Sequence, residues 1–563
     1  MTRPSPLSLR IVESSEAALR LDAAREWLDT HGGRGAVIVG ASRGAADDFA
    51  RLVAQRRGGA LGLHRFSFTQ LAAHIAAPVL AARGAVPVTR IGTEAVAARA
   101  AFEAAHAGEL SYFAPVAATP GFPRALARTL NELALSRVGP GQLRALPLGG
   151  ADLAALLERF DAQFAAASAT DRATLFEAAA EAADAFAGLP LLLLDVPIES
   201  AVEFSLAHRL IENASQALAL VPFGDLATLG HLETLGVKRE VLEPVATSDL
   251  TALRRNLFAG RQPPERVPTG EVQVFSAPGE ARECVEIARR IVQEARSGVR
   301  FDRIAVVLRS TADYVGLLED AFDRAGIPGW FERGARRPHP GGRSFLAMLA
   351  CAVERLSAIR FAEYLSLGQV PDGEEASRAP EPAMPAEDAV TGFARVEAQP
   401  EELEDSGPTA DRARGDHEMV VAGALRAPWK WEKLIVDSAV IGGDPERWRR
   451  RLRGLRGEFD GQLREARRED PDSARVGQIE RDIDNLAHLT VFALPLVDEL
   501  AAWPQSATWG EWLERFTALA PRALRRPGRV LRVLGELRPM AAVGPVSLEE
   551  ARGILAERLR TLD

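Results

Sequence analysis

The sequence predicts an α/β protein in which parallel β-sheets carry large helical insertions. Short apolar runs alternate with long patterns of apolar residues at three- and four-residue spacing, which is typical of strands joined by helices. The run LPLLLLDVP at 189–197 is almost continuously apolar, as a strand buried on both faces must be. A chain of 563 residues is too long for one core, so we expect several domains.

Residues 1–91 are predicted to form the first part of a sheet domain. The stretch VIVGASRGAADD at 37–48 is typical of a strand, a short loop and the start of a helix. A second strand is expected around Leu63 to Phe66, followed by a helix from Thr69.

The same domain is predicted to be interrupted and then resumed. Residues 92–186 repeat apolar residues at helical spacing, which indicates a helical insertion between strands. Residues 187–262 return to the sheet, with strands predicted within 189–200 and 217–225. The polar, proline-containing stretch RQPPERVPTG at 261–270 is expected to be a linker.

A second α/β domain is predicted to begin within residues 271–370. EVQVFSAP and FDRIAVVLRS are expected to be strands, each followed by an amphipathic helix. Residues 371–418 are acidic and rich in proline with little periodicity, and they predict a disordered insertion. Residues 419–563 are helical in pattern, and we expect a helical domain there.

The composition limits the classes of protein to which this chain can belong. The net charge of −9 neither demands nor excludes nucleic acid, because a basic groove can lie on an acidic protein. Cys284 and Cys351 are too few for a four-cysteine zinc or iron–sulfur site, and the histidines show no metal spacing, so we expect no metal site. No apolar run reaches the length of a membrane span and the N-terminus lacks an apolar signal core. We therefore expect a cytoplasmic protein with no membrane partner.

The loop after the strand at 37–40 has the layout of a phosphate-binding P-loop but lacks the side chains that bind phosphate and Mg²⁺. Such a loop needs glycines, so that main-chain N–H groups can surround the phosphates. It also needs a Lys on the β- and γ-phosphates and a hydroxyl on Mg²⁺. Alanines stand at the Lys and hydroxyl positions, and the arginine comes one residue early. The candidate remnant consists of Gly40, Ser42, Arg43, Gly44, Ala45 and Ala46. An ordinary turn between a strand and a helix is the alternative.

The buried strand at 191–194 ends at Asp195, where P-loop ATPases carry the carboxylate that holds the metal. The next residue in such enzymes is a Glu that acts on the attacking water, and here it is Val196. VPFGD at 221–225 then supplies a third strand, which ends in Gly-Asp. The pattern predicts RecA-like, P-loop NTPase-like motor domains that have lost the binding of ATP and Mg²⁺, with Asp195 as a remnant.

In this order, VGASRGAA, HRFSFTQLAAHI, LLLLDVPIES and VPFGD resemble superfamily 1 helicases of the UvrD/RecB type. The chain looks most similar to the AddB/RexB subunits of bacterial helicase–nucleases. The most specific stretch is 272–331, where IAVVLR is followed by a helix and AGIP. The resemblance covers residues 30–370 well and 419–563 loosely. It implies a role in DNA double-strand break repair and recombination, with DNA and an AddA-like motor subunit as partners.

The chain also departs from that family. The resemblance implies a C-terminal RecB-like nuclease domain of the PD-(D/E)XK family, flanked by iron–sulfur cysteines. No pattern such as G-x-x-D-R-x-D is present, and the chain has only two cysteines. We therefore expect either the N-terminal piece of a longer protein or a naturally shortened relative.

Three segments are candidates for DNA contact, and one of them is the basic, Gly/Pro-rich stretch RRPHPGGR at 336–343. RWRRRLRGLRGEFD at 447–460 is the densest basic stretch, and as a helix it would place Trp448, Leu452, Leu455 and Phe459 on one face. The alternative for this stretch is a solvated helix anchored by its tryptophan. In the first sheet domain, His64, Phe66 and Phe68 lie where related helicases contact single strands, with a core role as the alternative for one of the phenylalanines. The candidates are His64, Phe66, Arg447, Trp448, Arg449, Arg450, Arg453 and Arg456.

The sequence thus predicts a subunit with an inactive motor, which binds single- or double-stranded DNA and an AddA-like partner. Two alternatives stay open at this point. One is an active DNA-dependent ATPase with a rearranged site, in which Arg43 replaces the missing Lys. The other is a helical scaffold with no nucleic-acid role.

Overall fold

The computed structural model divides the chain into two compact units. The first combines Met1–Glu243 with Pro340–Leu562, and the second is Pro244–His339. The structure describes residues 8–31, 35–119, 121–242, 248–257, 265–331, 339–371, 420–421, 424–425, 428–560 and 562. The predicted insertion at 371–418 lies outside these residues, apart from position 371. Within the described ranges, no helix is both long enough and apolar enough to cross a membrane.

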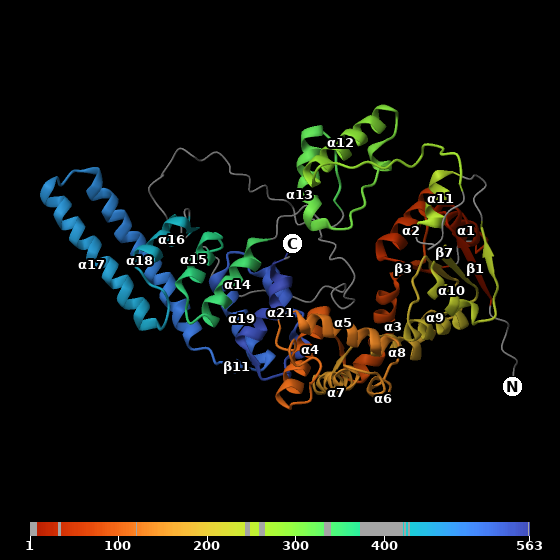
Figure 1. Cartoon of the computed structure of the whole chain (residues 1–563), viewed down its shortest axis with the longest axis horizontal. Coiled ribbons are helices and arrows are strands. Elements are labelled where there is room, and N and C mark those ends of the chain that lie inside the picture. The colour runs from red at the N-terminus through yellow and green to blue at the C-terminus, as the bar shows by residue number, and fades with distance from the viewer. Residues whose placement is uncertain are drawn as a thin grey trace. The chain divides into compact units, whose positions relative to one another are not determined.

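The first unit contains a six-stranded parallel sheet (Figure 1). Its strand order is β3-β2-β6-β7-β1-β8, and every neighbouring pair is parallel. The α/β class predicted from the sequence is therefore confirmed. The sequence patterns predict four of these strands and miss β1 and β8. The strands are β1 (Leu9–Ser14), β2 (Ala36–Gly40), β3 (Leu63–Ser67), β6 (Leu191–Leu194), β7 (Ala217–Pro222) and β8 (Arg239–Val241).

Helices cover both faces of this sheet. One face is covered by α1 (Ala17–Thr30) and α2 (Arg43–Arg57). The opposite face is covered by α3 (Phe68–Ala82), α8 (Arg172–Glu181), α9 (Ala201–Asn213) and α10 (Leu226–Glu233). Along β6, Leu192 and Leu194 face the first group while Leu191 and Leu193 face the second. This double burial explains why the strand is leucine throughout.

A large helical body in the same unit has one continuous core. That core joins helices of the predicted insertion with the C-terminal helices. Residues 340–370, which the sequence assigns to a second α/β domain, also belong to it, because Phe345 and Phe361 are buried there. The helices are α4 (Arg90–His106), α5 (Phe122–Leu135), α6 (Pro140–Arg144), α7 (Gly150–Ala166), α14 (Pro340–Val353), α15 (Ala358–Ser366), α16 (Pro428–Asp437), α17 (Pro445–Glu469), α18 (Ala474–Ala501), α19 (Trp509–Ala523), α20 (Gly528–Gly535) and α21 (Leu548–Arg560). Short strand pairs join β4 (Val86–Pro87) to β5 (Ala169–Thr170), β9 (Val420–Val421) to β10 (Ala424–Leu425), and β11 (Ser506–Ala507) to β12 (Val546–Ser547).

Both cysteines are buried and free, as the sequence predicts for thiols on apolar helix faces. Cys351 lies in α14 with no exposed surface. Burial raises the pKa of Cys351 to about 12, so its thiol stays protonated and unreactive at neutral pH.

A carboxylate buried beside α21 makes the stability of the helical body depend on pH. Glu536 is 6% exposed and accepts a hydrogen bond from Arg558 at 3.2 Å, and burial raises its pKa above the ordinary 4.5. The folded chain therefore holds this proton more tightly than the unfolded chain does. The free energy of unfolding falls as the pH rises from about 4.5 through the folded pKa. We expect Glu536→Gln to unfold at a higher urea concentration than the wild type at pH 8, with no difference at pH 3.5.

Glu109→Gln is the matched control for this prediction. A hydrogen bond from Arg159 lowers the pKa of exposed Glu109, so its contribution to stability runs the opposite way with pH. That variant is expected to be no more stable than the wild type at pH 8. If Glu536→Gln were the less stable protein at pH 8, the contact with Arg558 would outweigh the cost of burial.

The described residues of the second unit form helices and no sheet. It contains α11 (Asp249–Asn256), α12 (Glu280–Arg296) and α13 (Thr311–Ala325), and α12 packs on α13 through Cys284 and Leu318. The two long helices were predicted, but the predicted strands EVQVFSAP and FDRIAVVLRS are not formed. Residues 272–277 and 304–308 belong to no helix or β-ladder of the described chain. A strand exists only when another strand pairs with it, and no described segment does so here.

Candidate functional site

The carboxyl ends of the parallel strands are where this sheet offers a ligand site. Ligands of such sheets bind beyond the strand ends, where the connections of neighbouring strands turn to opposite faces. Two such boundaries lie beside candidate residues. The first separates β2, which leads into α2, from β6, which leads into α9. The second separates β7, which leads into α10, from β1, which leads into α1.

At the first boundary, the loop after β2 is a short capped turn. Only Ala41 and Ser42 separate β2 from α2. The Ser42 hydroxyl accepts a hydrogen bond from the Ala45 N–H at 3.1 Å, so this donor is already used. A side chain at Gly40 would lie 2.8 Å from the Ser42 carbonyl oxygen, which explains the glycine by close packing of the turn. These contacts are those of an ordinary turn between a strand and a helix.

The remaining candidates of this loop lie inside α2. Gly44 and Ala46 fall in its first turn, and Ala46 is fully buried against the sheet. Arg43 forms an ion pair with Asp47 at 3.0 Å, and Arg65 reaches the same carboxylate at 3.3 Å. Arg43 is thus held by a carboxylate of its own helix.

Beside the second boundary, an ion pair joins Asp195, which follows β6, to Arg20 of α1, the helix that follows β1. Both Asp195 carboxylate oxygens accept hydrogen bonds from Arg20, from Nε and Nη2, each at 2.8 Å. The remaining nitrogen of Arg20 donates to the Ser14 carbonyl at 2.6 Å. The Arg20 side chain is 8% exposed and that of Asp195 28%. Arg20 therefore links two strands that are separated by β7, and we call this contact the Arg20–Asp195 pair.

The backbone holds Asp195 in a conformation that favours this contact. Asp195 has a φ of +52°, in the left-handed region that few residues other than glycine adopt, and its N–H donates to Leu220 of β7 at 3.2 Å. The next residue, Val196, turns into the core and is 3% exposed. The strained residue thus directs its carboxylate to Arg20, and position 196 offers no polar group.

These residues do not fit a magnesium–nucleotide complex. The guanidinium of Arg20 engages both oxygens of Asp195, so a metal ion would have to displace a bidentate hydrogen bond. Among the residues that the structure describes, no group of three or more His, Cys, Asp or Glu side chains could hold a metal ion. No step of phosphoryl transfer can be derived from this arrangement.

His64 and Phe66 lie on β3, the strand at one edge of the sheet. They belong to a cluster of rings with His74 and Phe186, whose ring centres are 5.3–5.9 Å apart. The His64 side chain is exposed, whereas Phe66 is half-buried and packs on the sheet core. His64 can meet a ligand at this edge, and Phe66 mainly supports it.

The apolar face predicted for the basic helix is confirmed in α17. Trp448, Leu452 and Leu455 are buried, and the Trp448 indole donates to the Leu356 carbonyl at 3.0 Å. The ring of Phe361 contacts it edge-on at 5.4 Å. Trp448 has no exposed surface, so its prediction as a DNA contact is corrected: it anchors α17 to the core and cannot stack on a base.

The arginines of α17 divide into paired and unpaired groups. The paired ones are Arg449 with Asp498 at 2.6 Å, Arg456 with Asp460 at 3.1 Å, Arg453 with Glu446 at 3.9 Å and Arg467 with Glu480 at 2.5 Å. No ion pair with any described residue is formed by Arg447, Arg450, Arg451, Arg464 and Arg468, and all of these except Arg447 are exposed. The available positive charge of this helix therefore lies toward both of its ends.

Arg20 and Ser14 are not evident from the sequence pattern, because the pattern does not reveal β1. Arg10 and Glu13 interrupt the apolar run LRIVES, although Glu13 is buried and paired with Arg239 at 3.2 Å. A local signal for the helix after β1 is present. Serines such as Ser14 and Ser15 commonly precede the first turn of a helix, and a helical pattern follows them. No local signal connects Arg20 with an aspartate 175 residues later.

No family model matches the chain, and no curated protein matches its sequence significantly. The function must therefore be inferred from the geometry of the site.

Proposed function

We propose that this chain is a subunit of a DNA helicase–nuclease assembly, and that its own motor sheet does not use ATP. The observation that carries the proposal is the Arg20–Asp195 pair at the carboxyl edge of the sheet. A guanidinium there neutralises the carboxylate that would otherwise hold Mg²⁺. The chain thereby supplies its own cation in place of a metal–nucleotide complex.

The strand order supports a RecA-like assignment of the sheet. In RecA-like ATPases, one strand separates the strand that enters the phosphate loop from the strand that ends in the metal-binding Asp. β1 and β6 stand in this relation, with β7 between them, whereas β2 and β6 are direct neighbours. We therefore infer that the remnant of the phosphate loop is the segment SSEAALR at 14–20, rather than the loop at 40–46.

That segment lacks the groups on which phosphoryl transfer depends. It has no glycine and no lysine, and only Ser15 and Glu16 separate β1 from α1. Val196 stands where such enzymes have the Glu that orients water. Losing either the cation on the γ-phosphate or the water-orienting group typically costs orders of magnitude in rate. Both losses together favour a subunit that contributes binding rather than turnover.

The test of this proposal is the ATPase activity of the purified chain with and without single-stranded DNA. We expect no DNA-stimulated hydrolysis, against the turnover of about 1 s⁻¹ or more that is typical of active enzymes. Turnover at that level that disappears in Asp195→Ala would refute the inactive motor. If turnover were instead lost in Arg43→Ala, the rearranged site at 40–46 would be the active one.

The exposed arginines of α17 support a role in DNA binding. Arg450 and Arg451 are exposed in the first turns of the helix, and neither is neutralised by a described carboxylate. Unpaired arginines gain affinity for phosphates by releasing counterions, whereas paired ones must first give up a partner. We propose that the N-terminal turns of α17 contact the DNA backbone.

The double variant Arg450→Ala/Arg451→Ala is expected to weaken binding of single-stranded DNA. Two lost phosphate contacts should reduce the slope of log K against log salt by about 1.4. Arg456→Ala is the control, because Arg456 is held by Asp460 and its removal should leave the slope unchanged. Fluorescence anisotropy at several salt concentrations measures both variants. Binding with no salt dependence, or no binding by the wild type, would favour a scaffold without a nucleic-acid role.

A further inference from the structure

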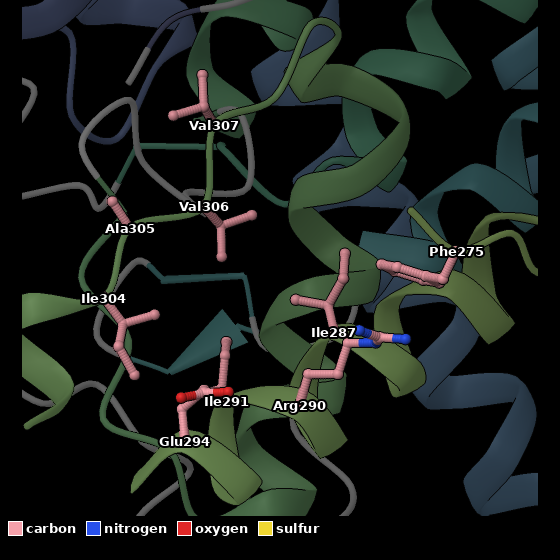
Figure 2. A pocket seen from close by; sticks show the side chains of 9 residues that line it. All are labelled: Phe275, Ile287, Arg290, Ile291, Glu294, Ile304, Ala305, Val306 and Val307. Atoms are coloured by element: carbon pink, nitrogen blue, oxygen red, sulfur yellow. The ribbon is translucent and has the colours of Figure 1, made fainter. Parts of the chain in front are cut away.

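An open groove in the second unit lies between the two segments that the sequence predicts to be strands (Figure 2). Its floor is one side of α12, which contributes Ile287 and Ile291. Phe275 stands at one side and residues 304–307 run along the other. The groove has a volume of about 380 Å³, and Arg290 and Glu294 are its only charged lining residues among those the structure describes.

Main-chain N–H groups on both sides of this groove lack main-chain hydrogen-bond partners. Within the described chain, no N–H of residues 272–277 or 305–309 donates to a main-chain carbonyl. Ile304 has the backbone angles of a strand, with φ −110° and ψ 132°, and residues 304–307 run on without a helical turn (Figure 2). Main-chain groups of a folded protein are almost always paired, so both segments present the donors and acceptors of a strand edge.

Apolar side chains of this unit are unusually exposed. Val274 is 94% exposed and Val307 93%, and each belongs to one of the two segments. Trp330, which follows α13, is 91% exposed, and Leu61 is the only other large apolar residue of the described chain above 90%. Soluble proteins rarely leave an unpaired, apolar strand edge uncovered, because it promotes association. The surface is therefore a site for another polypeptide segment.

We propose that this groove binds an extended, apolar β-strand of a partner polypeptide. The strand would pair its own N–H and C=O groups with residues 272–277 on one side and 304–308 on the other, as in β-strand addition. Alternate side chains would then pack on Ile287 and Ile291 of α12 or cover the exposed valines. A small apolar molecule or a helix would fill the volume, but neither would satisfy the main-chain groups.

A second copy of this chain fits the groove less well than a free strand does. Segment 272–277 runs into α12 at Glu280, and 304–308 into α13 at Thr311, so each has a helix packed beside it. The floor of the groove is already α12, which leaves no space for the helix that a second copy would bring. This proposal is independent of the role in DNA binding, since it uses no residue of the sheet or of α17.

The test is amide hydrogen exchange of the full chain with a synthetic peptide of sequence KKVIVIVKK. Main-chain amides at 272–277 and 305–308 are expected to exchange freely in the chain alone and at least tenfold more slowly with saturating peptide. The control peptide has the same sequence with all five apolar residues N-methylated, which keeps the side chains but removes the donors along both edges. It is expected to give no protection.

Three results would overturn the proposal: equal protection by both peptides, no protection by either peptide, or protection in the free chain. The last, if accompanied by a dimer in sedimentation, would assign the groove to a second copy. Val306→Asp is expected to abolish the effect of the peptide, because Val306 lines the groove. Leu61→Asp, at an exposed apolar position outside this unit, is expected to leave that effect unchanged.

Discussion

Arg20→Ala is expected to destabilise the six-stranded sheet and the helices packed on it by about 3 kcal/mol. Removing one partner of a largely buried ion pair leaves the other charge uncompensated. The substitution strips both hydrogen bonds from the Asp195 carboxylate and one from the Ser14 carbonyl. Urea unfolding followed by circular dichroism measures the loss. The double variant Arg20→Met/Asp195→Leu is expected to lose less than the sum of the two single changes, since it leaves no unpaired charge.

Arg10→Ala is the matched control in the same sheet. Arg10 pairs with Glu240 at 2.7 Å, but both side chains are about half exposed, at 45% and 47%. Water screens such a pair, so we expect a loss of only about 0.5 kcal/mol. Equal losses for Arg20→Ala and Arg10→Ala would mean that water reaches the Arg20–Asp195 pair and that it adds nothing special to the sheet.

Trp448→Ala is expected to cost about 4 kcal/mol, the typical cost of emptying a fully buried tryptophan site. The variant also leaves the Leu356 carbonyl without its donor and removes the edge contact with Phe361. Thermal and urea unfolding of the helical body should both shift to lower values. Any loss of DNA binding by this variant should follow the unfolded fraction rather than appear in the folded protein.

Trp330→Ala provides the comparison, because the same side chain is removed from a position that is 91% exposed. Its effect on stability is expected to stay within about 0.5 kcal/mol. A folded Trp448→Ala protein with normal stability and weakened DNA affinity would contradict the assignment of Trp448 to the core.

Much of the sheet could be predicted because its strands are locally distinct. The leucine run of β6 and the strand, loop and helix pattern around β2 carry their structure in a few consecutive residues. β1 could not be predicted in this way, because Glu13 looks like a surface residue until Arg239 of β8 is placed beside it. The order of the strands in the sheet depends on contacts between distant parts of the chain. The separation of β1 from β6 by one strand could therefore not be predicted from local patterns either.

The site was harder to predict than the fold. Asp195 could be identified from the strand that it ends, but its partner lies on a helix near the other end of the sheet domain. The same limit explains the strands predicted at 272–277 and 304–308. Their residues have the pattern of strands, yet a pattern supplies no partner, and the described chain does not provide one.

The shared core of the helical body has a consequence for how the protein is made. Helices α4 and α7 bury their apolar faces in the same core as α14 to α21, and Leu548 follows Ala166 by 382 residues. At about 5–20 residues per second, a ribosome needs from about 20 s to over a minute to deliver the missing helices. During that interval α4 and α7 wait with their apolar faces uncovered, which makes the nascent chain a substrate for chaperones that hold hydrophobic segments.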